Sequence, residues 1–248
     1  FLWVLLRMRL SHLLVFRLSF FGATFVDGSM FLLQILMFSA IYAHVDGIGG
    51  WGYGEMLVFV GTFSLINALN MVLYFFGIND LPRKIIHGDL DHYLTKPGSP
   101  LLRLTFERID LGSLPLVVMS LFIIAQGAAQ LETVLTLGRI LGYGFLVLVM
   151  TVLWYDVELV LRVAPFFTQS LQSLNRLEEL LSLSFRLPGV LLRGGYKFLF
   201  YFVLPYGIMA TLPTQTLAGA LSPGGYAYGL AVGVGFTALA LGLWRLGL

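Results

Sequence analysis

Side chains that could perform catalysis or bind a metal are few in this chain and form no recognised motif. Its 248 residues include 4 histidines and no cysteine, so thiolate ligands and thiol nucleophiles are excluded. A phosphate-binding GxxxxGKS or GxxxxGKT loop is absent, as are HExxH and GxSxG. His87 and His92 lie in a charged segment, where solvated side chains are a far better interpretation than a metal site. We therefore predict no catalytic residue, no metal site and no cofactor bound by this chain.

The most informative spacing occurs in a polar segment, 79–97. Gly88 suits the end of one short helix, and a second short helix fits between it and the end of the segment. In that second helix Leu90, Tyr93 and Leu94 follow the i, i+3, i+4 spacing of one face. Such an apolar ridge suits docking into a groove of another protein, and it equally suits resting on lipid headgroups.

The composition places these residues in a membrane protein. Hydrophobic residues make up 58% of the chain and charged residues 11%, and the mean hydropathy is +0.88. Because a soluble domain usually carries roughly 25% charged residues, most of this surface cannot face water. We predict an all-α integral membrane protein with no soluble domain.

Six stretches approach the roughly 20 apolar residues that a transmembrane helix needs. The fifth of them is short and contains Pro205, so we expect a kink there or an extension of this span back toward Val190. Residues 1–20 are apolar but carry arginines, which favours a helix in the membrane interface over an extension of the first span. The predicted spans are 25–44, 55–77, 109–130, 137–158, 197–212 and 226–244.

Basic residues are distributed unevenly among the connections between these spans. Of the 15 lysines and arginines, all except Arg139 fall on one predicted side. By the positive-inside rule, both termini and the two long connections are cytoplasmic. The sequence thus predicts a multi-pass protein of the plasma (inner) membrane.

Polar residues at mid-membrane depth are sparse. Gln34, Asn67 and Asn70 could line a substrate path, or they could form hydrogen bonds between helices. The acidic residues mostly fall near span ends, so no central carboxylate is available to carry a proton. This pattern disfavours a proton-coupled carrier.

Glycines recur at every fourth position along the sixth span, at Gly225, Gly229 and Gly233. Small residues at this spacing let two helix backbones approach closely within lipid. Packing inside the subunit is the favoured interpretation, and a face between two subunits is the alternative.

The 79–97 segment also contains a motif formed by Ile85, Gly88, Asp89, Leu90, Asp91, Leu94, Lys96 and Pro97. This motif resembles the loop after the second span in type-2 ABC exporter permeases, in their six-helix ABC-2 branch. Weaker landmarks of that branch are Arg186-Leu187-Pro188, Pro205 and Leu212-Pro213.

This resemblance implies a complex of two permease subunits, identical or paralogous, with two cytoplasmic ABC ATPase subunits that hold ATP and Mg²⁺ in separate chains. It implies that 1–20 is an elbow helix, that 79–97 and 166–186 are coupling elements docked on the ATPase, and that 213–225 is an external re-entrant element. Within 166–186, a helical spacing singles out Leu174, Leu177 and Leu181.

The function expected on these grounds is transport of an amphipathic or hydrophobic cargo out of the cytoplasm, by a permease that works with ABC ATPases and membrane lipids and binds no nucleic acid. An ATPase-independent carrier or channel is the main alternative. A membrane-embedded enzyme acting on lipid would need a cluster of acid, base or metal-binding groups, which the sequence lacks. A purely structural membrane subunit is the third alternative.

Overall fold

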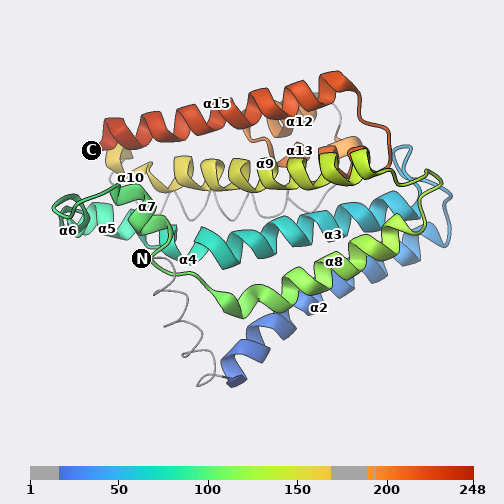
Figure 1. Ribbon diagram of the computed structural model, residues 1–248, viewed down its shortest axis with the longest axis horizontal. Helices are drawn as coiled ribbons and strands as arrows, with labels where there is room; N and C mark the ends of the chain where they lie inside the picture. The colour runs from blue at the N-terminus through green and yellow to red at the C-terminus, as the bar shows by residue number, and fades with distance from the viewer. Residues whose placement is uncertain (1–16, 169–188, 193) are drawn as a thin grey trace.

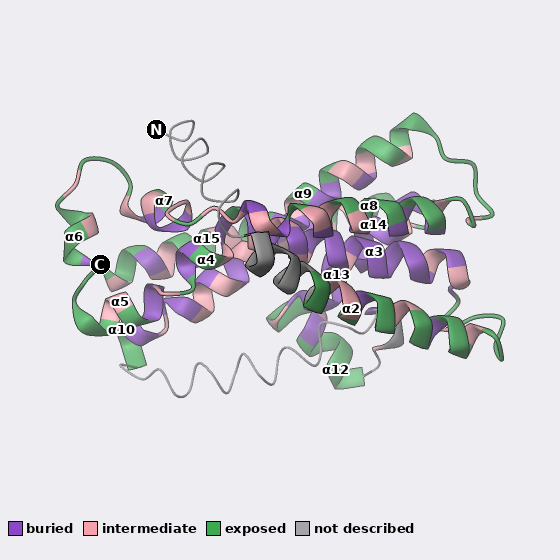
Figure 2. Ribbon diagram, turned by 90° about the horizontal axis from the view of Figure 1, so that it is seen from below, coloured by how far each residue is buried: buried purple, intermediate pink, exposed green. Residues whose placement is uncertain are grey.

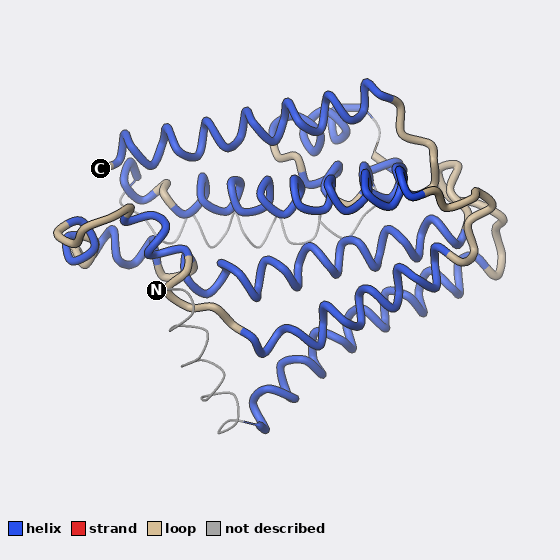
Figure 3. The backbone as a smooth tube through the Cα atoms, in the orientation of Figure 1, coloured by secondary structure: helices blue, strands red, loops and turns tan. Residues whose placement is uncertain are grey.

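The computed structural model describes residues 17–168, 189–192 and 194–248, and these form a bundle of helices (Figure 1). No strand occurs in these residues, whose backbone is helix and loop throughout (Figure 3), so the predicted all-α class is confirmed. The long helices are α2 (Arg17–Tyr42), α3 (Tyr53–Asn70), α8 (Leu114–Ala128), α9 (Leu137–Arg162) and α15 (Pro223–Gly247).

Four helical stretches of the described chain are long and apolar enough to cross a membrane. They correspond to the second, third, fourth and sixth predicted spans, and their bounds are Tyr53–His87, Leu111–Ala128, Leu137–Thr168 and Pro223–Gly247. The first predicted span falls in α2, in which a shorter apolar stretch covers Gly28–Tyr42. Since α2 begins at Arg17, residues 17–20 continue into that span. Residues 1–16 of the predicted elbow helix lie outside the described residues.

The fifth predicted span, 197–212, is not one helix, which corrects the sequence prediction. Pro205 has no N–H to donate, and Leu204 before it leaves the helical region with φ −131° and ψ 87°. The chain is divided here into α12 (Gly194–Phe198), the π-helical turn η4 (Leu199–Val203), α13 (Tyr206–Met209) and α14 (Thr211–Leu217).

The residues that lead into this divided segment lie next to its later part. The short helix η3 (Gly189–Leu191) begins at Gly189, whose backbone N–H donates to the Thr211 hydroxyl over 3.1 Å. A Cβ built on Gly189 would lie 2.1 Å from the carbonyl oxygen of Gly207. Residues 189–207 therefore fold back on themselves. The predicted re-entrant element 213–225 consists of the buried end of α14, a turn and the start of α15.

Charge separates the two ends of the bundle. α5 (Leu81–His87), α6 (Asp91–Leu94), α7 (Pro100–Thr105), α10 (Pro165–Thr168) and the C-terminus gather at one end, on the left in Figure 1. We call it the basic end, because it contains Arg83, Lys84, Lys96, Arg103, Arg108, Arg162 and Arg245. The opposite end, the loop end, is formed by connections 43–52, 129–136 and 218–222.

Two cations depart from this simple division. Arg139 starts α9 at the loop end, where its guanidinium lies against Gly219. Lys197, predicted to share the basic side, belongs to the fold-back segment and lies over the ring of Tyr201 at 5.4 Å. Arg176, Arg186 and Arg193 lie outside the described residues.

Glycines allow the central helices to pack closely. A Cβ on Gly127 of α8 would lie 2.7 Å from the backbone nitrogen of Val58, and one on Gly61 of α3 would lie 2.9 Å from the nitrogen of Ile124. These distances are shorter than van der Waals contact, so only glycine fits at either position. The backbones of α3 and α8 therefore approach each other closely at these two glycines.

The glycines predicted to pack α15 divide into two groups. Gly229 faces Met150 of α9 and Leu212 of α14, and Gly233 faces Val149 of α9. Gly225 instead lies against Leu221 in the preceding turn. Packing inside the subunit accounts for two of the three positions.

Burial is distributed as expected for a helical bundle in lipid. α3 is buried on nearly all sides, whereas α2, α8 and α15 expose one face each (Figure 2). The exposed side chains on these faces are mostly large and apolar. Such a surface is stable against acyl chains but not against water.

We predict that Gly127→Ala lowers stability despite the better helix propensity of alanine. The added methyl would collide with backbone atoms of α3, so α3 and α8 must separate, at a cost of about 1–3 kcal/mol in the free energy of unfolding. Thermal unfolding of the detergent-solubilised protein measures this. The matched control is Gly144→Ala in α9, where nothing lies within 4 Å of the added carbon. Equal melting temperatures for the two variants would contradict the close approach.

Candidate functional site

The segment predicted to dock on a partner forms two short helices at the basic end, as expected. α5 ends at Gly88, whose φ of 77° lies in the left-handed region that glycine adopts without strain. α6 begins at Asp91, with Leu90 at its N-cap position.

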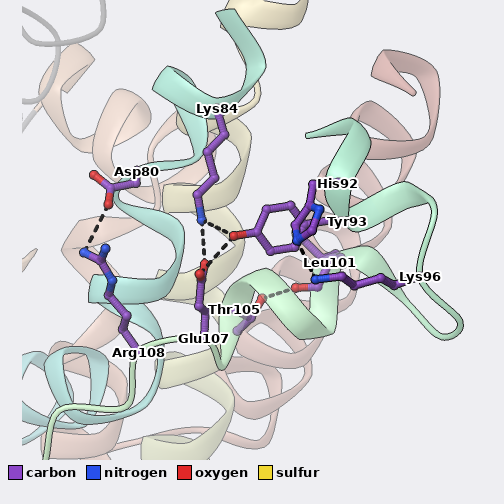
Figure 4. A network of polar contacts seen from close by, with 9 residues as sticks. All are labelled: Asp80, Lys84, His92, Tyr93, Lys96, Leu101, Thr105, Glu107 and Arg108. Carbon is purple, nitrogen blue, oxygen red and sulfur yellow. Dashed lines mark hydrogen bonds and ion pairs between the residues drawn. The ribbon is translucent and has the colours of Figure 1, made fainter. Parts of the chain in front are cut away.

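A polar network holds these two helices to the segment after α7 (Figure 4). Lys84 Nζ of α5 lies 2.5 Å from Glu107 Oε2 and donates to the Tyr93 hydroxyl over 2.8 Å. The Tyr93 hydroxyl of α6 in turn donates to Glu107 Oε1 over 2.9 Å. Three separate elements are therefore joined by one closed triangle of hydrogen bonds.

The network lowers the pKa of Glu107. Burial by itself would raise the pKa of Glu107, but hydrogen bonds from Lys84 and Tyr93 and the charges of Lys84 and Arg108 lower it below its usual value. A carboxylate with a lowered folded pKa stabilises the fold above its unfolded pKa, and this contribution disappears as pH falls through the folded value. The nearby Arg108–Asp80 pair, at 3.1 Å, is more exposed and contributes less.

The apolar ridge predicted for α6 is not exposed as expected. Leu90 is only 5% exposed, because the N-cap position directs its side chain into an apolar cluster with Leu81 and Leu104. Tyr93 is half-buried, since its hydroxyl is held in the network. Of the predicted ridge only Leu94 remains at the surface, 42% exposed. The role of the segment in coupling stays a prediction.

The face that the basic end does present combines two apolar side chains with charge. Ile86, at the end of α5, is 39% exposed and accompanies Leu94. The remaining motif residues Ile85 and Lys96 are half-buried. We define the exposed face by Ile86, His87, Asp89, Asp91, His92 and Leu94.

Two further contacts order the chain after α6. Lys96 Nζ lies 2.6 Å from His92 Nε2. Arg103 donates to the carbonyl of Pro97 over 2.7 Å. Pro97 therefore closes the turn that leads into α7.

Buried charge joins the end of α9 to this region. Arg162, 3% exposed, pairs with Glu158 one turn earlier, with Nη2 and Oε2 2.9 Å apart. Its Nη1 donates to Asn79 Oδ1 over 2.8 Å, in the connection that leads into α5. Its guanidinium also lies 5.5 Å from the ring centre of Phe75. A single guanidinium thus links α9 to the start of the predicted coupling element.

The second predicted coupling element, 166–186, is described only at its beginning. Phe166 of α10 packs against Trp244 of α15 with ring centres 6.0 Å apart. Leu174, Leu177 and Leu181 lie outside the described residues.

The predicted path residues come from two neighbouring helices, α2 and α3. Gln34 and Asn67 are partly buried on α2 and α3, and Asn70 is 3% exposed. Among the described residues, Asn70 Oδ1 has no hydrogen-bond partner. The π-helical turn η1 (Met71–Phe75) begins directly after it.

A comparison with protein families decides the class of this molecule. A family model described as an ABC-2 family transporter protein matches residues 29–248. The chain belongs to the ABC-2 family. It is thus a membrane permease of the ABC transporter type and not itself a catalytic subunit, and the resemblance drawn from the 79–97 motif is confirmed. No curated protein and no solved structure matches this ABC-2 permease.

Sequence reasoning missed the polar groups that organise the basic end of the permease. The i, i+4 spacing of Glu158 and Arg162 was a readable signal for their pairing. The contacts of Arg162 with Asn79 and of Glu107 with Lys84 join residues far apart in sequence, so no local pattern predicts them. The same holds for Asp156 of α9, which accepts a 2.5 Å hydrogen bond from Thr237 of α15.

We predict that Glu107→Gln in this ABC-2 permease loosens α5 and α6 without unfolding the bundle. The variant leaves Lys84 half-buried without its carboxylate, at a cost of about 1 kcal/mol. At neutral pH the backbone amides in 81–97 should exchange faster in the variant than in wild type. When both proteins are measured at the same pH, below the folded pKa of Glu107, this difference in exchange rate should disappear. Glu132→Gln, on an exposed residue at the loop end, is the control. Unchanged exchange in Glu107→Gln would show that the network does not hold these helices.

Proposed function

We propose that this chain is the permease subunit of an ATP-driven exporter that moves an amphipathic or hydrophobic cargo out of the cytoplasm. In this proposal the basic end is cytoplasmic, and separate ABC ATPase subunits, which hold ATP and Mg²⁺, dock there. A second permease subunit, identical or paralogous, completes the complex in the plasma membrane. Family membership and the charge difference between the two ends support this arrangement.

The observation that carries the proposal is the exposed face of α5 and α6. Its two apolar side chains, Ile86 and Leu94, lie among charged and polar ones, which is the composition of a docking surface. Behind this face, the network of Lys84, Tyr93 and Glu107 fixes both helices to the segment after α7. Because α5 and α6 are held in place, a displacement of this face moves both helices together and does not deform them.

The link to the spans is provided by buried contacts. Arg162 joins α9 to the connection before α5, and Leu90 packs in one cluster with Leu159 of α9 and Trp244 of α15. Movement of the docking face on ATP binding would therefore be passed to α9 and α15 as a unit.

The nature of the cargo is inferred from the surfaces that the bundle offers. Among the described residues, the large side chains exposed on the spans are mostly apolar, and most of the buried hydroxyls in the helices already donate to a backbone carbonyl in the preceding turn. A strongly hydrated solute would find little to replace its water. An amphipathic or hydrophobic molecule taken from the membrane or its inner boundary fits better.

Replacing both apolar residues of the docking face tests the proposal most directly. Vesicles containing the permease and its cognate ATPase should show vanadate-sensitive transport. Ile86→Asp combined with Leu94→Asp should reduce it by about tenfold or more, since two carboxylates would be placed in the contact with the ATPase. Leu90→Asp is unsuitable because Leu90 is part of the core.

The matched control is Val134→Asp, which alters an exposed valine at the loop end. It should transport as wild type does. Full transport by the double variant would overturn the docking role, and flux through purified permease without any ATPase would favour a carrier or channel.

A second prediction concerns Arg162. Arg162→Lys keeps the charge but loses the planar guanidinium that reaches Glu158 and Asn79 together, at a cost of about 1–3 kcal/mol in stability. Because the docking face is unaltered, ATP hydrolysis by the assembled complex should persist while transport per ATP falls. Arg245→Lys, an exposed change in the last turn of α15, is the control. A parallel loss of hydrolysis and transport would place Arg162 in assembly and not in transmission.

A further inference from the structure

A pocket of about 220 Å³ opens on the flank of the bundle beside α7 and the basic end. It lies between the π-helical turn η1, the end of α7 and the middle of α9. Its lining residues are Leu73, Tyr74, Leu102, Thr105, Phe106, Thr151, Val152 and Tyr155.

The polar groups in the lining already have partners. Tyr74 donates to the carbonyl of Thr151 over 2.9 Å, and the hydroxyls of Thr105 and Tyr155 lie 2.7 Å apart. The Thr151 hydroxyl donates to the carbonyl of Val147 over 2.8 Å. Since a buried water needs at least two polar partners, this pocket suits neither water nor a polar ligand. Its occupant must be apolar.

Exposed apolar side chains border the pocket. Leu73, Leu102 and Val152 are all exposed there, and in an integral membrane protein acyl chains cover such side chains. The atoms that line an empty apolar pocket lack dispersion contacts on the side that faces the pocket. Insertion of the neighbouring acyl chain restores these contacts without displacing bound water.

Charge next to the mouth favours a lipid that carries a phosphate. Arg103 follows Leu102 directly, and among the described residues no carboxylate lies within ion-pair distance of it. Its guanidinium donates to the carbonyl of Pro97. Guanidinium groups match phosphate oxygens in both charge and geometry.

The other charges near the mouth are compensated. Arg108 pairs with Asp80, and Lys84 pairs with Glu107. Asp110 accepts hydrogen bonds from the Gly112 N–H and the Ser113 hydroxyl. Arg103, by contrast, takes part in no ion pair among the described residues, so its charge is available to a ligand.

We propose that this pocket binds one acyl chain of a membrane phospholipid whose phosphate lies at Arg103. The site requires only that the chain lies in a bilayer, so it stands apart from the exporter function and from its ATPase. A lipid held here would touch η1, α7 and α9 at once.

Photo-crosslinking in nanodiscs tests the acyl part of the proposal. The probe is a phosphatidylglycerol with a diazirine near the end of one acyl chain, and mass spectrometry locates the label. In wild type the label should concentrate on residues 102–106 and 151–155. Val152→Trp, which fills the mouth, should abolish labelling of 102–106, whereas Val118→Trp on the exposed face of α8 should not. Labelling spread evenly over the apolar surface, or unchanged in Val152→Trp, would overturn the proposal.

A second variant tests the phosphate part and leaves the apolar walls intact. Arg103→Gln should reduce labelling by the phospholipid probe to the level seen with a diazirine-bearing diacylglycerol, which has no phosphate. If wild type is labelled equally by both probes, Arg103 does not hold the phosphate. None of these measurements depends on transport, so their failure is separate from failure of the exporter proposal.

Discussion

Arg162 lies buried where α9 reaches the basic end, and its charge has to be neutralised there. Removing a guanidinium from water is costly unless its donors are satisfied in a fitting geometry. Glu158 neutralises the charge, and Asn79 Oδ1 accepts a hydrogen bond from the guanidinium. The ring of Phe75 lies against the guanidinium. Because these partners come from different segments, satisfying one cation fixes the positions of α9, η1 and the entry to α5 together.

Elsewhere in the bundle, packing takes the place of charge. In lipid there is little hydrophobic force between helices, so association depends on close contact and on hydrogen bonds. The α3–α8 contact uses backbone approach at Gly61 and Gly127. The α9–α15 contact adds the hydrogen bond between Asp156 and Thr237. The helices nearest the centre are thus held by two different devices, one steric and one polar.

The sequence predicts the parts of this structure that depend on local composition. Helical spans around α3, α8, α9 and α15, the two short helices separated by Gly88, and the interruption at Pro205 all follow from residue types within a few positions. Charge distribution predicts which connections share an end, apart from Lys197. The fold-back of 189–207 could not be predicted, because it depends on Gly189 meeting Gly207.

The candidate site was predictable in location but not in orientation. The motif identified the family, and its segment forms the two expected short helices, yet helical spacing treated Leu90, Tyr93 and Leu94 as one surface. Spacing describes a face of an isolated helix, whereas Leu90 stands at the cap and points inward, and Tyr93 is drawn back by Glu107. Only long-range contacts determine which side of a short helix is buried.

The π-helical turn η1, which follows α3 in the same apolar stretch, changes which neighbours that stretch contacts. One extra residue in a helical turn advances the side chains beyond it by about 100° around the axis relative to an uninterrupted α-helix. Before the turn, Gly61 faces α8; within it, Tyr74 donates to the Thr151 carbonyl of α9, and beyond it Gly77 lies against α7. The face of this span that packs on α8 before the turn is therefore not continued beyond it, where the span packs on α7 instead, while α9 borders both parts.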